Sequence, residues 1–217
     1  MLRLAHRGDW RRAPENTIPA LLAALKVPAC NGIEFDVRLS SDGVPVLLHD
    51  ETLQRVQGVD VRVDDLTAEA LEAHGVPTLE AVLFALPRRA FLDVELKGDH
   101  GRAAVDVLTG FRGPGLERAV VSSFEAGTLE RVGRLAASWP RWLNAEDLSD
   151  ATIRTATDLD CRGVSVDWHA IDARSFARAR AADLEVAAWT VRRLPTYRKL
   201  ERMGVVAICA EAAALDL

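Results

Sequence analysis

The chain has 217 residues, 49% of them hydrophobic and 27% charged, and its formal net charge is −5. This composition is typical of a globular protein, and we expect residues 1–217 to form a single domain. Its apolar runs stop short of the roughly 18 residues that span a membrane, and its negative charge argues against binding nucleic acid.

Short β-rich runs alternate with helical patterns along the chain. Eight strands are expected, at Leu2–His6, Gly32–Val37, Phe91–Leu96, Ala119–Ser123, Arg141–Ala145, Gly163–Asp167, Glu185–Val191 and Val205–Cys209. Helical spacing of Leu, Ala and Val occurs at Thr17–Lys26, Thr78–Leu86, Gly127–Ala137 and Ala173–Ala182. Eight alternating βα units predict a compact (β/α)8 TIM barrel, and a doubly wound open sheet is the alternative because periodicity does not show closure.

The segment between the second and third strands is too long for one helix. Val44–Leu48 follows the turn Ser41-Asp42-Gly43 and is predicted to fold back as a hairpin strand. The polar stretch Glu51–Asp65 is then expected to form a surface excursion over the barrel mouth.

Carboxylates alternate with apolar residues on two of the strands. Glu34 and Asp36 share one face of the second strand. Glu95 and Lys97 share one face of the third strand with Asp93, which lies one layer deeper and is expected to be structural. Such faces could be solvated on an open strand, but barrel strands are buried on both faces, where unpaired carboxylates are costly. Three carboxylates favour one hard divalent cation, Mg²⁺ or Ca²⁺.

Two histidines lie at the ends of predicted strands, each beside another charged residue. His6 precedes Arg7, and His49 precedes Asp50. Two histidines that face one phosphate can act as acid and base near neutral pH, and an arginine suits bidentate contact with phosphate oxygens. The other three histidines are expected to be structural: His74, His100 and His169.

The segment Pro14-Glu15-Asn16-Thr17 precedes an apolar helix. Asn16 or Thr17 can cap that helix, and Glu15 can also support the site from behind. Glu15 and Asn16 are therefore candidates for either role.

The order and spacing of these motifs resemble the glycerophosphodiester phosphodiesterase family of the PLC-like phosphodiesterase superfamily. Members carry H-R-G, P-E-N-T, E-x-D-V, H-D and E-x-K in this order, which here are His6–Gly8, Pro14–Thr17, Glu34–Val37, His49–Asp50 and Glu95–Lys97. Looser matches at Pro77–Glu80, Ser122–Phe124 and Trp189–Val191 extend the resemblance over most of the chain.

The resemblance implies a hydrolase that cleaves small-molecule glycerophosphodiesters to glycerol 3-phosphate and an alcohol, with one divalent cation as cofactor. It implies three groups of site residues: the metal ligands Glu34, Asp36 and Glu95, the phosphate-binding Arg7 and Lys97, and the acid–base pair His6 and His49. Which histidine is the acid in the first step stays open.

Three aromatic residues are candidates for lining the substrate. Phe124 and Trp189 lie near the C-terminal ends of the fourth and seventh strands, where they either pack the barrel or form an apolar wall against the glycerol carbons. Trp10 lies in the loop after the first strand and either packs on a neighbouring loop or stacks over the leaving alcohol, with a preference for choline.

The chain departs from the family pattern at three places. Arg192 follows Trp189-Thr190-Val191, where relatives commonly carry Asn. The last strand ends in Cys209-Ala210-Glu211-Ala212 instead of Thr-Asp-x-Pro, and the excursion is short. These departures concern the alcohol group and the shape of the mouth. Other functions compatible with the motifs are a phospholipase-like enzyme acting on lysolipid, a metal-dependent barrel lyase or racemase, and a non-enzymatic phosphoester-binding module.

The three cysteines, Cys30, Cys161 and Cys209, are far apart in the sequence and lie in apolar surroundings. They predict free thiols in a reducing compartment. Because the chain enters a strand directly after Met1, no signal peptide is expected, and we predict a cytoplasmic location. The sequence does not define an oligomeric state.

Overall fold

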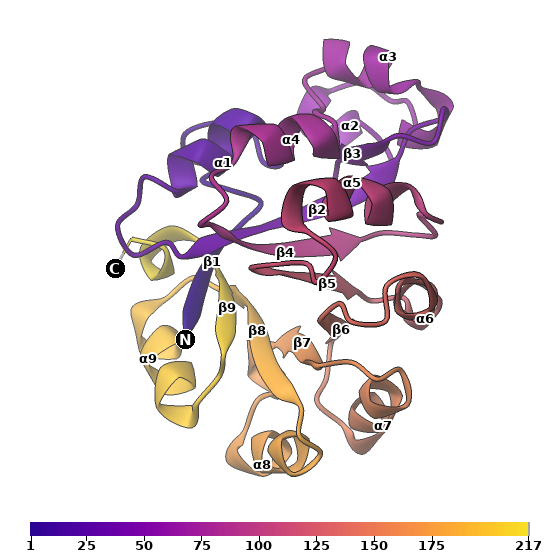
Figure 1. Ribbon diagram of the computed structural model, residues 1–217. Coiled ribbons are helices and arrows are strands. Elements are labelled where there is room, and N and C mark those ends of the chain that lie inside the picture. Colours follow the sequence, from indigo (N-terminus) through magenta and orange to yellow (C-terminus); the bar gives the residue numbers. More distant parts are fainter. Residues whose placement is uncertain (217) are drawn as a thin grey trace.

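The computed structural model describes residues 1–216, and its parallel strands close into a barrel with helices around the outside (Figure 1). The strands of the barrel are β1 (Leu2–His6), β2 (Gly32–Leu39), β4 (Phe91–Leu96), β5 (Ala119–Ser123), β6 (Arg141–Ala145), β7 (Gly163–Asp167), β8 (Glu185–Val191) and β9 (Ala207–Ala210). β1 pairs with both β2 and β9, which closes the sheet. The predicted TIM barrel is therefore confirmed, and the open sheet is excluded.

Helices of the outer layer connect successive strands. They are α1 (Ile18–Ala24), α4 (Leu79–Ala85), α5 (Ala103–Arg112), α6 (Ala126–Leu135), α7 (Asp150–Asp158), α8 (Ala173–Ala181) and α9 (Leu194–Met203). Several begin at a side-chain cap, as at Thr17, Thr78 and Asp172, whose oxygens accept hydrogen bonds from backbone N–H groups of the first turn. None of the described helices is long and apolar enough to cross a membrane.

The excursion between β2 and β4 has its own small core. β3 (Pro45–Leu47) pairs antiparallel with β2, as the hairpin prediction required. Helix α2 (Gln54–Gln57), the 3₁₀ turn η1 (Val63–Asp65) and helix α3 (Ala68–Ala73) follow, and Figure 1 shows α3 projecting beyond the ring of helices. The excursion buries six apolar side chains: Val46, Leu48, Leu53, Val63, Leu71 and Val76. The polar stretch is thus more ordered than a loop, because two apolar residues within it reach this core.

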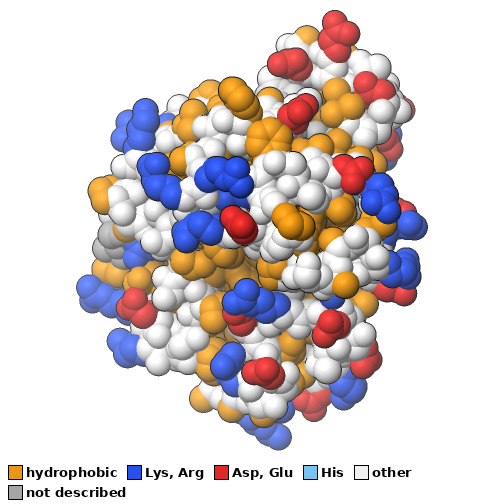
Figure 2. All heavy atoms as spheres, in the orientation of Figure 1, with side chains coloured by type: hydrophobic (Ala, Val, Ile, Leu, Met, Phe, Trp, Pro, Cys, Tyr) orange, Lys and Arg blue, Asp and Glu red, His pale blue; other side chains and the backbone are white. Residues whose placement is uncertain are grey.

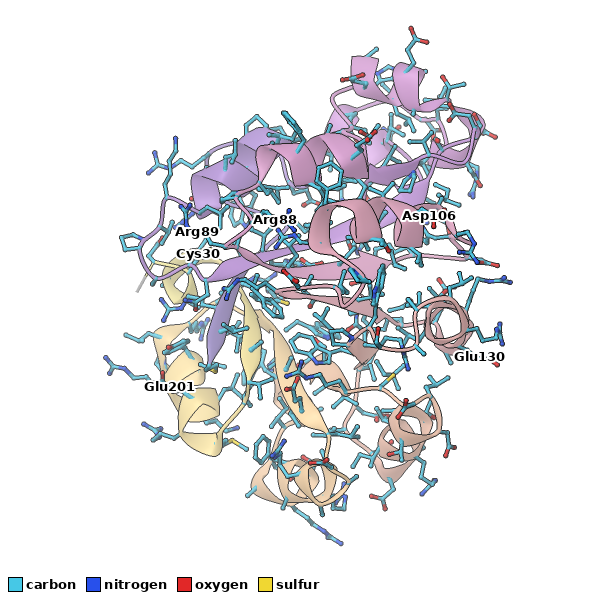
Figure 3. All side chains as sticks on the ribbon, in the orientation of Figure 1. Cys30, Arg88, Arg89, Asp106, Glu130 and Glu201 are labelled. Atoms are coloured by element: carbon cyan, nitrogen blue, oxygen red, sulfur yellow. The ribbon has the colours of Figure 1, made fainter. Side chains whose placement is uncertain are left out.

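The end of the barrel where the chain enters the strands carries both basic and acidic side chains. Cys30, Arg88 and Arg89 precede β2 and β4, while Asp106, Glu130 and Glu201 lie on outer helices (Figure 3). Figure 2 shows basic and acidic side chains scattered over this face without a continuous patch of one sign, and no histidine is visible on it.

The cysteines are free thiols, with Cys161 and Cys209 buried and Cys30 half-buried.

Alternation along the strands separates the apolar core from a polar lumen. Ile33, Phe35 and Val37 are fully buried in the main core. The intervening Glu34 and Asp36 point to the other face, where they sit beside Asp93 and Glu95 of β4 in register. The carboxylates of the two strands therefore meet inside the barrel.

Candidate active site

A central cavity of about 220 Å³ opens at the carboxyl ends of the strands. Most of the predicted site residues line it, namely His6, Arg7, Glu34, His49, Glu95, Lys97, Phe124 and Trp189. Asp36 lies fully buried next to this wall, in contact with Arg7 and Lys97. Trp10 instead lines a neighbouring side cavity of about 410 Å³, which also has His6, Arg7 and Glu15 in its wall.

Three carboxylates converge behind the central cavity. One oxygen each of Glu34, Asp36 and Glu95 lies within 4.8 Å of the others. Burial and then the charges of Asp36 and Glu95 raise the pKa of Glu34 well above its ordinary value. Burial and the charge of Asp36 also raise the pKa of Glu95. Oε1 of Glu34 is buried and has no hydrogen-bond partner among the described residues. This is an acceptor that a cation would satisfy.

Two basic side chains partly neutralise the cluster. The Arg7 Nε lies 3.0 Å from Asp36 Oδ2, and the Lys97 Nζ lies 3.1 Å from Asp36 Oδ1. Lys97 also forms an ion pair with Glu95. Burial alone would raise the pKa of Asp36, but the charges of Arg7 and Lys97 lower it to about 2. Three carboxylates against two bases leave a negative site, which suits a divalent cation.

The H-R-G motif has a conformational reason for its glycine. Arg7 has φ 56° and Gly8 has φ 89°, so the chain turns sharply after β1. A Cβ on Gly8 would lie 2.7 Å from the backbone carbon of Ala20, which leaves no room for another residue. The turn directs the backbone N–H of Arg7 to the Glu34 carbonyl, at 2.9 Å, and places the Arg7 side chain against Asp36.

The ring of His6 is held by a carboxylate from the last strand. Nδ1 of His6 lies 2.5 Å from Oε1 of Glu211, and Nε2 faces Glu34 at 3.8 Å. Arg192 donates from Nε to the other oxygen of Glu211, at 2.8 Å. Burial opposes ionisation of Glu211, but the hydrogen bond from His6 and the charge of Arg192 bring its pKa to about 2. Glu211 therefore orients His6 with Nε2 toward the cavity.

Sequence reasoning noted Glu211 and Arg192 only as departures from the family pattern. An available signal was the barrel itself: closure makes the first and last strands neighbours, so an acid that follows the last strand lies near the histidine that ends the first. Figure 1 shows β1 and β9 side by side, and their register pairs Ala5 with Ala210.

The ring of His49 is held in a similar way from the excursion. Nδ1 of His49 lies 2.6 Å from Asp50, and Arg55 of α2 donates from Nε to the other oxygen of Asp50, at 2.6 Å. Arg55 also binds Glu15, at 2.6 Å, and Glu15 accepts a hydrogen bond from Arg7, at 3.0 Å. Burial is the main reason that the pKa of His49 is lowered, and Asp50 acts in the opposite direction.

The P-E-N-T segment contributes to both scaffold and site. Thr17 caps α1, as one interpretation predicted. Asn16 is buried and donates from Nδ2 to Asp36 Oδ2 at 2.8 Å, while its Oδ1 accepts from the backbone N–H of Asp36. Asn16 thus fixes a carboxylate of the cluster, and Glu15 links Arg7 to Arg55.

The other residues noted in the sequence lie around this centre. Asp93 accepts a hydrogen bond from the Ser122 hydroxyl at 2.6 Å, and burial raises its pKa to about 7. Phe124 and Trp189 meet edge to face with ring centroids 5.6 Å apart, so they form one apolar wall. His100 is buried with its ring against the Lys97 carbonyl, whereas His169 is exposed and stacks on Trp168.

Comparison with known proteins places this site in a family. The family model for the glycerophosphoryl diester phosphodiesterase family matches residues 6–214. YhdW of Bacillus subtilis strain 168, assigned as a glycerophosphodiester phosphodiesterase, is 29% identical over 97% of this chain and 94% of its own. A Mycobacterium tuberculosis protein, assigned as glycerophosphodiester phosphodiesterase 2, is 30% identical over 99% of this chain and 88% of its own.

Solved structures agree with this placement. An Oleispira antarctica phosphodiesterase, solved in complex with the product sn-glycerol-3-phosphate, is 26% identical with a TM-score of 0.84, over 97% of this chain and 92% of its own. The Thermotoga maritima glycerophosphodiester phosphodiesterase shares the fold, with a TM-score of 0.85 at 23% identity, over 100% of this chain and 96% of its own. The chain therefore belongs to the glycerophosphoryl diester phosphodiesterase family.

Proposed function

We propose that this protein hydrolyses glycerophosphodiesters to glycerol 3-phosphate and a free alcohol, with one bound divalent cation and His6 and His49 as its proton-transfer groups. The observation that carries the proposal is the pair of histidines, each held at Nδ1 by a carboxylate, beside a cluster of three acids and two bases. The family to which the chain belongs, and the product bound to its Oleispira relative, support the same reaction.

Glu34, Asp36 and Glu95 are the residues that would hold the cation. Their oxygens are close enough to share one ion, and the buried Oε1 of Glu34 has no other partner among the described residues. Carboxylate-only ligation favours Mg²⁺ or Ca²⁺ over softer metals. When bound, the cation neutralises charge on the phosphoryl oxygens.

The protein's own residues divide the remaining work. Arg7 and Lys97 line the cavity and bind the phosphate oxygens, and both carry positive charge beside Asp36. One histidine takes the proton of the glycerol 2-hydroxyl as that oxygen attacks phosphorus, and the other gives a proton to the departing alcohol. Water then opens the cyclic phosphate with the roles reversed, which releases glycerol 3-phosphate.

The test is an assay for release of glycerol 3-phosphate from choline, ethanolamine, glycerol and inositol diesters. We expect turnover to collapse in excess chelator and to return with Mg²⁺ or Ca²⁺, while the circular dichroism spectrum stays unchanged. Asp36→Asn should lose both activity and calorimetric binding of the restoring ion. Full activity in excess chelator would contradict the metal assignment, and failure to release glycerol 3-phosphate from any diester would contradict the function.

A further inference from the structure

A third cavity of about 370 Å³ lies at the carboxyl end of the barrel, outside the residues that the proposed reaction uses. We call it the outer cavity, and it is lined by Trp168, His169, Thr190, Arg192, Arg193 and Thr196. Trp168 and His169 belong to the 3₁₀ turn η2 (Trp168–Ala170), which follows β7. The others come from the end of β8 and the start of α9.

The outer cavity is connected to the centre through shared walls. Thr190 lines the central, side and outer cavities. His6 and Arg7 line both the central and side cavities, and Arg192 lines both the side and outer cavities. The three cavities are therefore neighbours, and Arg7 and Arg192 both line the side cavity between the central and outer ones.

The positive charge in the outer cavity is available to a ligand. Arg192 binds Glu211 only through its Nε. Its Nη atoms have no partner among the described residues, and the side chain is 63% exposed. Within residues 1–216, the exposed side chain of Arg193 has no ion-pair partner. The start of α9 adds partial positive charge.

The negative groups near the outer cavity are already engaged. Among residues 1–216 no carboxylate lines it, and the two carboxylates that contact its arginine and histidine are Glu211, which binds Arg192 and His6, and Asp167, which binds His169. Glu211 holds the Arg192 side chain at its Nε edge, and so leaves the two Nη groups to meet an anion. This is the geometry in which guanidinium groups bind phosphate oxygens.

We propose that the outer cavity is an anion subsite that binds a second phosphate group, carried on the leaving alcohol of the substrate. The inference rests on the proposed function and specifies its substrate class: deacylated phospholipids with a phosphorylated headgroup. The two guanidinium groups and the hydroxyl of Thr196 supply the donors for a phosphate monoester, which carries a charge of about −1.5 to −2 at neutral pH. A quaternary ammonium headgroup would face the same guanidinium groups with the wrong sign.

The first measurement compares two substrates that differ by one phosphate: glycerophosphoinositol and glycerophosphoinositol 4-phosphate. We expect kcat/KM to be higher for the phosphorylated diester by about 2- to 25-fold, because each of the two exposed guanidinium groups contributes less than about 5-fold. Arg193→Gln should reduce this ratio by about 2- to 5-fold, and high salt should reduce it as well. Arg198→Gln is the matched control, because it removes an exposed arginine from the same helix but outside the cavity, and its ratio should stay at the wild-type value.

The second measurement separates the subsite from catalysis. Calorimetric binding of inositol 4-phosphate to the wild-type protein should weaken in Arg193→Gln and not in Arg198→Gln. If neither diester is cleaved but this difference in binding is found, the subsite stands and the proposed reaction is wrong. Equal binding to all three proteins, or a substrate ratio that Arg193→Gln leaves unchanged, would overturn the subsite.

Discussion

The two histidines proposed to transfer protons are held by the same kind of contact but by different parts of the molecule. In each case a carboxylate contacts Nδ1, at 2.5 Å for His6 and 2.6 Å for His49, and an arginine binds that carboxylate. Glu211, behind His6, follows the last barrel strand and is 9% exposed, whereas Asp50, behind His49, adjoins it in sequence and is 26% exposed.

This difference between Glu211 and Asp50 shows which part of the fold maintains the orientation of each histidine ring. Orientation of His6 depends on closure of the barrel, so it persists as long as the whole fold does. Orientation of His49 depends on the excursion, which has a separate core of six apolar side chains and supplies Arg55, whose side chain is 49% exposed. Glu15 connects the two regions by direct contact, because it binds both Arg55 and Arg7.

The largest effect is expected from removing either histidine. His6→Ala and His49→Ala should each lose about 10² to 10⁴ in kcat, the usual contribution of a general acid or base. A substrate with an acidic leaving group, such as nitrophenol, needs little protonation as it departs. It should therefore rescue the variant that lacks the acid much more than the variant that lacks the base. Equal rescue of both variants would show that the roles are not divided.

A smaller effect is expected from neutralising the carboxylates. Glu211→Gln and Asp50→Asn should each lower kcat/KM about 10- to 100-fold, because a charged hydrogen bond contributes about 1.5–3 kcal/mol. Asp50 raises the pKa of His49, so its loss should lower that pKa and move the limb of the pH profile due to His49 to lower pH. The pH dependence of kcat/KM measures this shift.

Asp64→Asn is the control for the carboxylate variants. Asp64 is an exposed acid of the same excursion that pairs with Arg62 and not with a histidine. Its pH profile should match the wild type, whereas an unshifted profile in Asp50→Asn would mean that Asp50 does not act through His49.

The smallest effect is expected from the outer arginines, measured with glycerophosphocholine. The side chains of Arg55 and Arg192 are 49% and 63% exposed, and such ion pairs contribute about 0.2–1 kcal/mol. Arg55→Gln and Arg192→Gln should therefore lower kcat/KM less than about 5-fold. Arg55→Gln should have the larger effect, since Arg55 holds both Asp50 and Glu15. Arg62→Gln is the control, because it removes an exposed ion pair of the excursion that does not reach the site, and it should leave kcat/KM unchanged. An equal loss of kcat/KM in all three arginine variants would contradict the comparison.

The alternation of residues along single strands was sufficient to predict the features of the site and fold that depend on those strands alone. Alternation along β2 and β4 predicted which carboxylates share a face, and the turn before β3 predicted the hairpin. The helical turn around Arg55 was not predicted, because it is only four residues long and depends on burial of Leu53 in the excursion core.

Contacts that need the closed barrel could not be read from pattern alone. Glu211 lies 205 residues from His6, and the two meet only because β9 pairs with β1. The contact of Arg192 with Glu211 depends instead on the pairing of β8 with β9, which places Val191 opposite Ala210 and so brings the residues that follow them together. No periodicity in the sequence specifies which of many exposed arginines makes such a contact.

Closure of the sheet through β1 and β9 also has a consequence for biosynthesis. Glu211 lies 205 residues after His6, so it leaves the ribosome long after His6, and a nascent chain that stops short of β9 leaves Nδ1 of His6 without this carboxylate. The carboxylates Glu34, Asp36 and Glu95, by contrast, all lie in the first half of the 217-residue sequence. The pair of His49 and Asp50 lies there too. A chain truncated before β9 would therefore retain all three clustered carboxylates but lack the carboxylate that holds His6.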